Sequence, residues 1–146
     1  MIVTKIFNSV NKPNITEKSE IINFLFENLE QYGDPKQDIQ KCIDYALKET
    51  PSFGGLILVS YHEKEISGVV VINETGMKDY IPENILVYIA THKDFRGQGI
   101  GKALMRQTIE LTKGNIALHV EPDNPARFLY EKVGFTSKYM EMRLIK

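Results

Sequence analysis

The sequence predicts a single α/β domain over residues 1–146, and three observations lead to this fold class. The chain has 146 residues, about the length of one domain. Short apolar runs rich in β-branched residues alternate with longer segments whose apolar residues recur at helical spacing. The segment order is β-α-α-β-β-β-α-β-α-β, which predicts a mixed sheet of six or seven strands flanked by about four helices.

The N-terminal third predicts one strand followed by two helices. Residues 2–7 are rich in β-branched side chains and are typical of a strand. Thr16 or Glu17 is expected to open the first helix, whose apolar face is broad. Asp34 is a natural N-cap for the second helix, and Pro35 is a natural first-turn residue.

The middle of the chain predicts a hairpin and a buried strand. Residues 55–61 and 65–72 form the two arms of the hairpin, and Ser67-Gly68 can hold a bulge in the second arm. A polar loop follows. Residues 85–90 are continuously apolar, which indicates a strand buried on both faces.

The C-terminal part predicts two helices and two strands. One helix runs from about residue 99 to residue 113, and residues 116–120 are the next strand. Residues 125–133 are a short helix with Gly134 as its C-terminal stop. A final strand is expected within residues 135–145.

Composition excludes several classes of protein. The formal net charge is −1, which argues against a nucleic-acid binder that depends on bulk electrostatics. One cysteine excludes a disulfide framework, and with three scattered histidines we expect no metal site. No apolar run approaches the ~18 residues of a membrane span, and the N-terminus lacks the features of a signal peptide, so we expect a cytoplasmic protein.

The near-zero net charge hides an asymmetry along the chain. Residues 17–50 hold eight acidic residues against four lysines, a balance of −4. Residues 85–146 hold ten basic against six acidic residues, a balance of +4. Solvated surfaces explain such a distribution by default. The alternative is an anion site in the C-terminal half opposite an acidic N-terminal half.

A glycine-rich turn separates the buried strand from the helix that follows it. Gly97, Gly99 and Gly101 alternate with other residues, and Arg96 and Lys102 flank them with positive charge. Glycine adopts backbone angles that other residues avoid and lets the main chain approach a ligand closely. Unpaired N–H groups at a helix start bind phosphate or pyrophosphate. The turn fits neither the P-loop nor the dinucleotide fingerprint, because its glycine spacing differs from both.

Two motifs resemble those of the GNAT family of N-acetyltransferases. The stretch RGQGIG, from Arg96 to Gly101, matches the family pattern R/Q-x-x-G-x-G/A. The stretch from Asn124 to Phe135 looks like the second family motif, N-x-A-x-x-L-Y-x-x-x-G-F. The resemblance covers residues 55–146 well, whereas residues 1–54 match only in strand-helix-helix order. It implies the single-domain GNAT fold and an acetyl-CoA-dependent N-acetyltransferase.

The resemblance also implies where acetyl-CoA lies. In the family the glycine-rich turn binds its pyrophosphate, chiefly through main-chain N–H groups. The preceding strand bulges and pairs with the pantetheine arm, and the next strand splays away to leave a gap for the acetyl group. For Asn124, capping of the following helix explains the residue equally well. The cofactor contacts expected on this basis are Ile89, Ala90, Thr91, Arg96, Gly97, Gln98, Gly99, Ile100, Gly101, Lys102, Asn124 and Tyr130.

The resemblance implies one catalytic residue and leaves the second open. Tyr130 is the usual general acid of the family, which protonates the departing thiolate, and a tyrosine held by packing is the structural alternative. Many relatives use a glutamate on the bulged strand as base, but residues 85–90 contain no carboxylate. His119 is our candidate base, although a structural histidine or a water chain also fits. Glu121 and Glu83 are open alternatives.

The acceptor is expected at the connection between the two N-terminal helices, which builds the acceptor pocket in the family. The negative charge of residues 17–50 favours a small cationic primary amine. No covalent acetyl-enzyme is expected, since Cys42 lies far from both motifs in the sequence. Dimers are common in the family, so a homodimer is a further expectation. The residues expected to contact the acceptor are Glu27, Glu30, Tyr32 and Asp34.

Three other functions remain open at this point. The chain could acetylate a protein amine, or it could be a non-catalytic acyl-CoA-binding or regulatory domain with the same fold. The missing strand carboxylate favours the regulatory domain and Tyr130 favours the enzyme. A module that binds only nucleotide phosphate is the third, and it would bind ADP-like ligands as tightly as the complete coenzyme.

Overall fold

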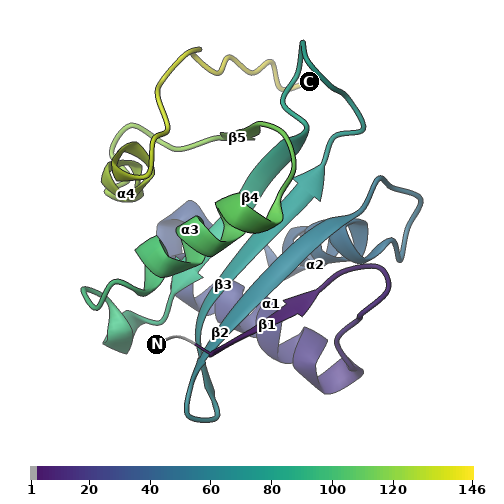
Figure 1. The fold of residues 1–146 in the computed structure, drawn as a ribbon, viewed down its shortest axis with the longest axis vertical. Helices are drawn as coiled ribbons and strands as arrows, with labels where there is room; N and C mark the ends of the chain where they lie inside the picture. Colours follow the sequence, from purple (N-terminus) through teal and green to yellow (C-terminus); the bar gives the residue numbers. More distant parts are fainter. Residues whose placement is uncertain (1–2) are drawn as a thin grey trace.

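The computed structural model describes residues 3–146, which fold into a central sheet with helices on both faces (Figure 1). Most of the predicted elements are present at close to the predicted positions. In chain order they are β1 (Val3–Phe7), α1 (Ile15–Asn28), a 3-10 turn η1 (Glu30–Tyr32), α2 (Lys36–Leu47), β2 (Gly55–His62), β3 (Glu65–Glu74), β4 (Asn84–Thr91), a 3-10 turn η2 (Lys93–Phe95), α3 (Ile100–Leu111), β5 (Ile116–Leu118) and α4 (Ala126–Lys132).

The sheet has five strands in the order β1-β2-β3-β4-β5. The first four strands pair antiparallel with their neighbours, and β4 pairs parallel with β5. In β3, Ser67 is the extra residue between the pairs Ser60–Gly68 and Tyr61–Ile66, so the predicted bulge is confirmed. The mixed α/β fold class is likewise confirmed.

Side chains of the central strands alternate between two apolar cores, as the period of a strand requires. One core joins the sheet to α1 and α2, through residues such as Ile21, Leu25 and Ile43. The other joins the opposite face to α3 and α4, through Leu104 and Met105. Figure 1 shows α3 on one face of the sheet and α1 and α2 on the other. Helices on both faces explain why β4 reads as a continuous apolar run.

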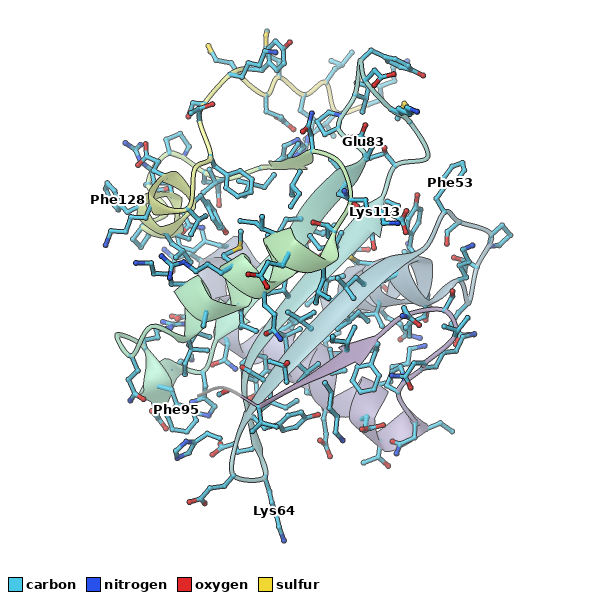
Figure 2. All side chains as sticks on the ribbon, viewed as in Figure 1. Phe53, Lys64, Glu83, Phe95, Lys113 and Phe128 are labelled. Carbon is cyan, nitrogen blue, oxygen red and sulfur yellow. The ribbon has the colours of Figure 1, made fainter. Side chains whose placement is uncertain are left out.

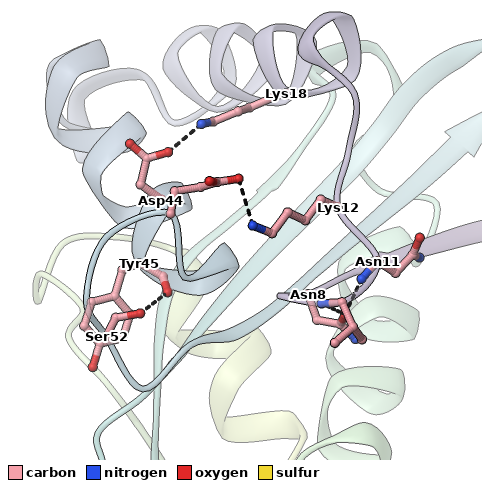
Figure 3. Close-up of polar contacts among 9 residues, drawn as sticks. Asn8, Asn11, Lys12, Lys18, Asp44, Tyr45 and Ser52 are labelled. Atoms are coloured by element: carbon pink, nitrogen blue, oxygen red, sulfur yellow. Dashed lines mark hydrogen bonds and ion pairs between the residues drawn. The ribbon is translucent and has the colours of Figure 1, made fainter.

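Helix α1 begins at Ile15, one or two residues before the predicted Thr16 or Glu17. Asn14 is the N-cap, its side chain accepts a hydrogen bond from the amide of Glu17, and the Glu17 side chain accepts one from the amide of Asn14. This reciprocal pair satisfies two amide donors of the helix start. Lys18 then pairs with Asp44 at 2.5 Å and ties α1 to α2 (Figure 3).

The predicted final strand within residues 135–145 is absent, so the expected count of six or seven strands is wrong. Residues 135–146 have no regular structure. A strand needs a neighbouring backbone for its ladder, and no part of residues 3–146 pairs with this segment. Its apolar side chains include two adjacent pairs, Tyr139-Met140 and Leu144-Ile145, with Met142 between them. Five of them are more than 80% exposed, namely Tyr139, Met140, Met142, Leu144 and Ile145.

Within the described residues, no helix has both the length and the apolar character needed to cross a bilayer.

Candidate active site

A gap opens between β4 and β5 because the two strands pair over only three residues. The last pair is Leu86 with Leu118, whereas β4 continues to Thr91. The register of β4 against β3 shifts at Val87, which is the extra residue between the pairs Val71–Tyr88 and Ile72–Leu86. The bulge implied by the family resemblance is therefore present, and no strand within residues 3–146 pairs with residues 87–91 on the β5 side.

The glycine-rich turn lies at the end of this unpaired stretch. Gly97 and Gly99 both have φ of +80°, the left-handed region that favours glycine. A Cβ atom added at either position would meet no other atom within 4 Å, so both glycines face open space. Gly99 is the N-cap of α3.

The backbone amides of residues 97–102 donate no hydrogen bond to any acceptor within residues 3–146. The first amide of this region that is bonded belongs to Ala103, which donates to the Gly99 carbonyl at 3.0 Å. Unpaired amides at the positive end of a helix dipole form a site for an anion. The side chains of Gln98 and Lys102 are exposed beside these amides.

Gly101 brings the turn close to two other elements of the site. A Cβ atom at this position would lie 3.1 Å from Leu129 Cδ2 in α4 and 3.6 Å from Thr91 Oγ1 in β4. Ile89 and Ile100 pack in the core shared with α4, whereas Ala90 is buried in the core shared with α1 and α2. The turn, the end of β4 and α4 are thus brought together.

The C-terminal end of α1 holds the glycine-rich turn in place. The Arg96 guanidinium donates to Glu30 Oε1 at 2.8 Å and to the Asn28 carbonyl at 2.9 Å. The Asn28 side chain accepts from the Lys93 amide at 3.1 Å, although it lies on a buried helix face. Arg96 lowers the pKa of Glu30, chiefly through this hydrogen bond. Sequence reasoning missed Asn28, because a single buried polar residue on an apolar face carries no local signal.

Tyr130 of α4 is a buried side chain whose hydroxyl group is not used in a hydrogen bond within residues 3–146. Its side chain is 7% exposed and its ring lies 6.0 Å from that of Phe135. Burial raises the pKa of Tyr130 to about 12, so the phenol stays protonated near neutral pH.

Asn124 is engaged in shaping the start of α4. Its side-chain oxygen accepts from the Ala126 amide at 2.9 Å, and its carbonyl accepts from the Arg127 amide at 3.2 Å. The N-cap of α4 is Pro125 and no side chain caps the helix, so Asn124 stabilises the turn before α4 and is not its cap. Its side-chain amide group donates no hydrogen bond within residues 3–146.

The candidate bases lie in different places. His119 is exposed and directly follows Leu118, the last paired residue of β5, so it lies at the mouth of the gap. Glu121 is exposed in the loop that follows. Glu83 accepts from the amides of Asn115 and Asp79 at 2.7 and 3.2 Å, and these bonds lower its pKa. Figure 2 shows Glu83 and Phe95 at opposite ends of the molecule, so Glu83 lies away from the turn.

The segment between α1 and α2 reaches three elements of the site. Besides the Glu30–Arg96 pair, the Tyr32 hydroxyl donates to the Asp123 carbonyl at 3.3 Å. The Tyr88 hydroxyl of β4 donates to Asp34 Oδ2 at 2.5 Å. Three of the four predicted acceptor residues are therefore placed at the site, and Glu27 is exposed on α1.

Asp34 does not cap α2, which corrects the sequence prediction. The N-cap is Pro35, with φ of −56° and ψ of 149°, and no side chain caps the helix. The carboxylate of Asp34 is bonded to Tyr88 instead. Pattern reasoning named Tyr88 only as a strand residue, because its partner lies 54 positions away in the sequence.

Cys42 is held in an unreactive state on α2. Burial raises the pKa of its thiol to about 12, and the Asn73 side-chain amide lies 3.4 Å from the sulfur. Because the thiolate is the nucleophilic form, this cysteine has little reactivity near neutral pH.

Comparisons with known proteins identify similar sequences. A family model described as the acetyltransferase (GNAT) domain matches residues 54–137. The chain is 36% identical over 84 residues to a 5-NmdU N-acetyltransferase of Pseudomonas phage PaMx11. That alignment covers 56% of this chain and 58% of the phage protein, so the chain spans less than two thirds of the relative's length.

Comparisons with solved structures identify similar folds. An aminoglycoside 6'-N-acetyltransferase from Acinetobacter haemolyticus superposes with a TM-score of 0.71 at 14% identity, covering 99% of this chain and 97% of that chain. An aminoglycoside N-acetyltransferase in complex with CoA gives a TM-score of 0.70 at 14% identity, covering 100% and 95% of the two chains. At such low identity these similarities establish the fold alone.

Proposed function

The chain belongs to the GNAT acetyltransferase family, and we propose that it transfers the acetyl group of acetyl-CoA directly to a primary amine of a small cationic molecule. The single observation that carries this proposal is the row of unpaired amides at residues 97–102 beside the unpaired stretch of β4. An anion-binding helix start next to free strand backbone suits a ligand with a pyrophosphate and an extended amide arm.

Acetyl-CoA is therefore proposed to lie along β4 with its pyrophosphate on the turn. The amides of residues 97–102 bind the phosphate oxygens, with Arg96 and Lys102 adding positive charge. The backbone groups of Ile89, Ala90 and Thr91 pair with the pantetheine arm, as an added strand would. This placement directs the acetyl group into the gap between β4 and β5.

Tyr130 is the proposed general acid. The amine nitrogen attacks the thioester carbon, the carbon–sulfur bond breaks, and the coenzyme leaves as a thiolate. Tyr130 donates its hydroxyl proton to that sulfur. Burial, which raises the pKa of Tyr130, keeps the phenol protonated and able to donate at the pH of the reaction.

The segment from Asn28 to Asp34 is the proposed acceptor side of the site. Glu30 and Asp34 contribute negative charge, Tyr32 contributes a hydroxyl group next to the β5–α4 loop, and Glu27 adds charge farther out on α1. A cationic amine suits this charge. The names of the similar proteins refer to 5-NmdU and to aminoglycosides, so these compounds are the first acceptors to test.

A thiol-release assay tests this function. The purified protein is mixed with acetyl-CoA and, in turn, with polyamines, aminoglycosides, 5-NmdU and peptides carrying a free amine. We expect thiol release with a small cationic amine. Release only with peptides would favour a protein acceptor, and tight coenzyme binding without release from any amine would favour a binding domain. Equal calorimetric affinity for ADP and acetyl-CoA would favour a phosphate module.

A further inference from the structure

One hydrogen bond in the site has no assigned role in the proposed chemistry. The Tyr88 hydroxyl donates to Asp34 Oδ2 at 2.5 Å, which joins β4 to the segment between α1 and α2. The Tyr88 side chain is 7% exposed, whereas Asp34 is exposed to solvent. The pair therefore connects a buried hydroxyl group to a carboxylate that can exchange protons with water.

Tyr88 stands where the gap between β4 and β5 begins. It follows the bulge residue Val87 and lies two positions beyond Leu86, the last residue of β4 that pairs with β5. Its side chain belongs to the core on the α1 and α2 face. Tyr130 comes from α4, which covers the opposite face. A thioester in the gap would thus have Tyr130 on one side of the sheet and Tyr88 on the other.

The position of Asp34 is unusual for a residue that only stabilises the fold. An aspartate before a proline at a helix start normally caps the helix through its carboxylate. Here α2 has no side-chain cap, and the carboxylate is bonded to Tyr88. Asp34 therefore bonds to β4, the strand that borders the gap, and does not form the local capping bond that would stabilise α2.

The electrostatic surroundings keep the Tyr88 phenol protonated. Burial contributes most to the raised pKa of Tyr88, followed by the hydrogen bond to Asp34. Electrostatic repulsion by Cys42 and Asp38 of α2 raises the pKa of Tyr88 further. A protonated phenol that donates to Asp34 still has a free lone pair on its oxygen, which can accept a hydrogen bond from an ammonium group.

We propose that Tyr88 Oη receives the proton that the acceptor amine must lose before attack, while Tyr88 passes its own hydroxyl proton to Asp34. This inference rests on the proposed acetyltransferase function. It makes Tyr88 the residue that touches the amine, and Asp34 a positioning residue that acts through Tyr88.

The protons balance over one turnover. An N–H bond of the ammonium breaks as an O–H bond forms on Tyr88, and the Tyr88 proton moves to Asp34 and then to water. The neutral amine attacks, and its nitrogen loses a second proton along the same path as the amide forms. Tyr130 supplies one proton to sulfur and recovers one from water. The net products are the amide, the free thiol and one proton.

The pH dependence of two variants tests this proton path. The probe is the polyamine or aminoglycoside that gives the fastest thiol release with the unmodified protein. Tyr88→Phe removes the relay oxygen, and Asp34→Asn keeps an oxygen that accepts from Tyr88 but that does not take up its proton. We expect kcat/KM for the amine to fall about 10²-fold near neutral pH in both. The deficit should shrink as pH rises toward about 10, because a growing share of the amine is then neutral in water without the relay.

Matched controls come from α2, the helix that follows Asp34. Tyr45→Phe removes a hydroxyl that donates to the Glu74 carbonyl at 2.7 Å, and Asp44→Asn weakens the pair with Lys18 (Figure 3). Both should keep the pH profile of the unmodified protein. Calorimetry should give the same acetyl-CoA affinity for all four variants. If Tyr88→Phe fails to fold, Asp34→Asn, with its exposed side chain, still provides the test.

Each outcome separates this inference from the function on which it rests. A deficit that disappears at high pH in both variants supports the proton path. An active parent whose variants show no deficit, or an equal deficit at every pH, overturns the proton path and leaves the acetyltransferase function in place. A pH-dependent deficit in His119→Gln alone would give the role to His119. A parent that releases no thiol with any amine overturns both.

Discussion

Tyr130 is a buried phenol with its hydroxyl group free, and this combination is informative at the scale of single residues. A tyrosine that serves only packing gains from having its hydroxyl bonded when it is buried. Tyr130 is 7% exposed, and no acceptor within residues 3–146 receives its proton. The hydroxyl oxygen is not fully enclosed, so a bound thioester can reach it, and this fits the proposed role as proton donor.

Replacing Tyr130 with phenylalanine tests its role as the acid. We expect turnover to fall about 10²- to 10⁴-fold, because the thiolate would leave without a proton donor. The acetyl-CoA affinity should change less than about twofold, since the ring and its packing remain. Stopped-flow thiol detection and calorimetry give the two values. Unchanged turnover with intact binding would remove Tyr130 from the mechanism.

Cys42 gives a second prediction, for both activity and stability. Cys42→Ala should retain full turnover, because the buried thiol carries no acetyl group in a direct transfer. The raised pKa of Cys42 also stabilises the folded protein below about pH 9, and this contribution is lost as pH rises toward 12. In urea titrations, the stability advantage of the parent over Cys42→Ala should shrink above pH 9 by at most about 1.4 kcal/mol per pH unit. Loss of turnover in the variant would indicate a covalent intermediate.

The glycine-rich turn is the element on which coenzyme binding depends. We expect Gly99→Ala to strain the left-handed backbone by about 1–2 kcal/mol and to reorient the amides, so that the acetyl-CoA Kd rises at least about tenfold. Gly54→Ala is the matched control, because Gly54 has φ of +79° and faces only the flexible Lys48 side chain. Both variants should lose similar stability in urea, and equal coenzyme affinity in the two would argue against the turn as the pyrophosphate site.

Removing the contact between η1 and the turn should change the affinities for acetyl-CoA and for the acceptor in opposite directions. Glu30 pairs with Arg96, so the pyrophosphate must compete with Glu30 for that guanidinium. In Glu30→Gln, the acetyl-CoA Kd should fall about two- to fivefold, while the KM for a cationic acceptor should rise. Calorimetry and steady-state kinetics measure the two effects. A change of the same sign in both would mean that Glu30 only supports the loop.

The elements that sequence reasoning located correctly are those with local causes. The bulge at Ser67, the turn at residues 96–101 and the glycine that ends α4 each follow from backbone preferences over a few positions. The elements that it missed depend on distant partners. The Asp34 carboxylate accepts a hydrogen bond from Tyr88 instead of capping α2. The segment after residue 135 has no neighbouring strand within residues 3–146 to pair with. Asn28 looks like an ordinary helix residue until the Lys93 amide is placed against it.

At the scale of the whole molecule, the two regions of opposite charge meet at one site. The basic C-terminal part contributes Arg96 and Lys102 at the turn, and the acidic N-terminal part contributes Glu30 and Asp34 across from it. The Arg96 guanidinium joins the two regions, because it donates to Glu30 and to the Asn28 carbonyl at the C-terminal end of α1. The near-zero net charge thus hides two oppositely charged regions, which we propose to bind the pyrophosphate and the cationic acceptor.

The most direct test of the central claim follows the acetyl group itself. The protein is incubated with acetyl-CoA carrying an isotopic label in its acetyl group and with the best amine from the thiol assay, and mass spectrometry quantifies the label in the amine and in the protein. We predict one labelled amide for every free thiol and no label on the protein. Bound acetyl-CoA that never transfers its label to any amine would contradict the assignment.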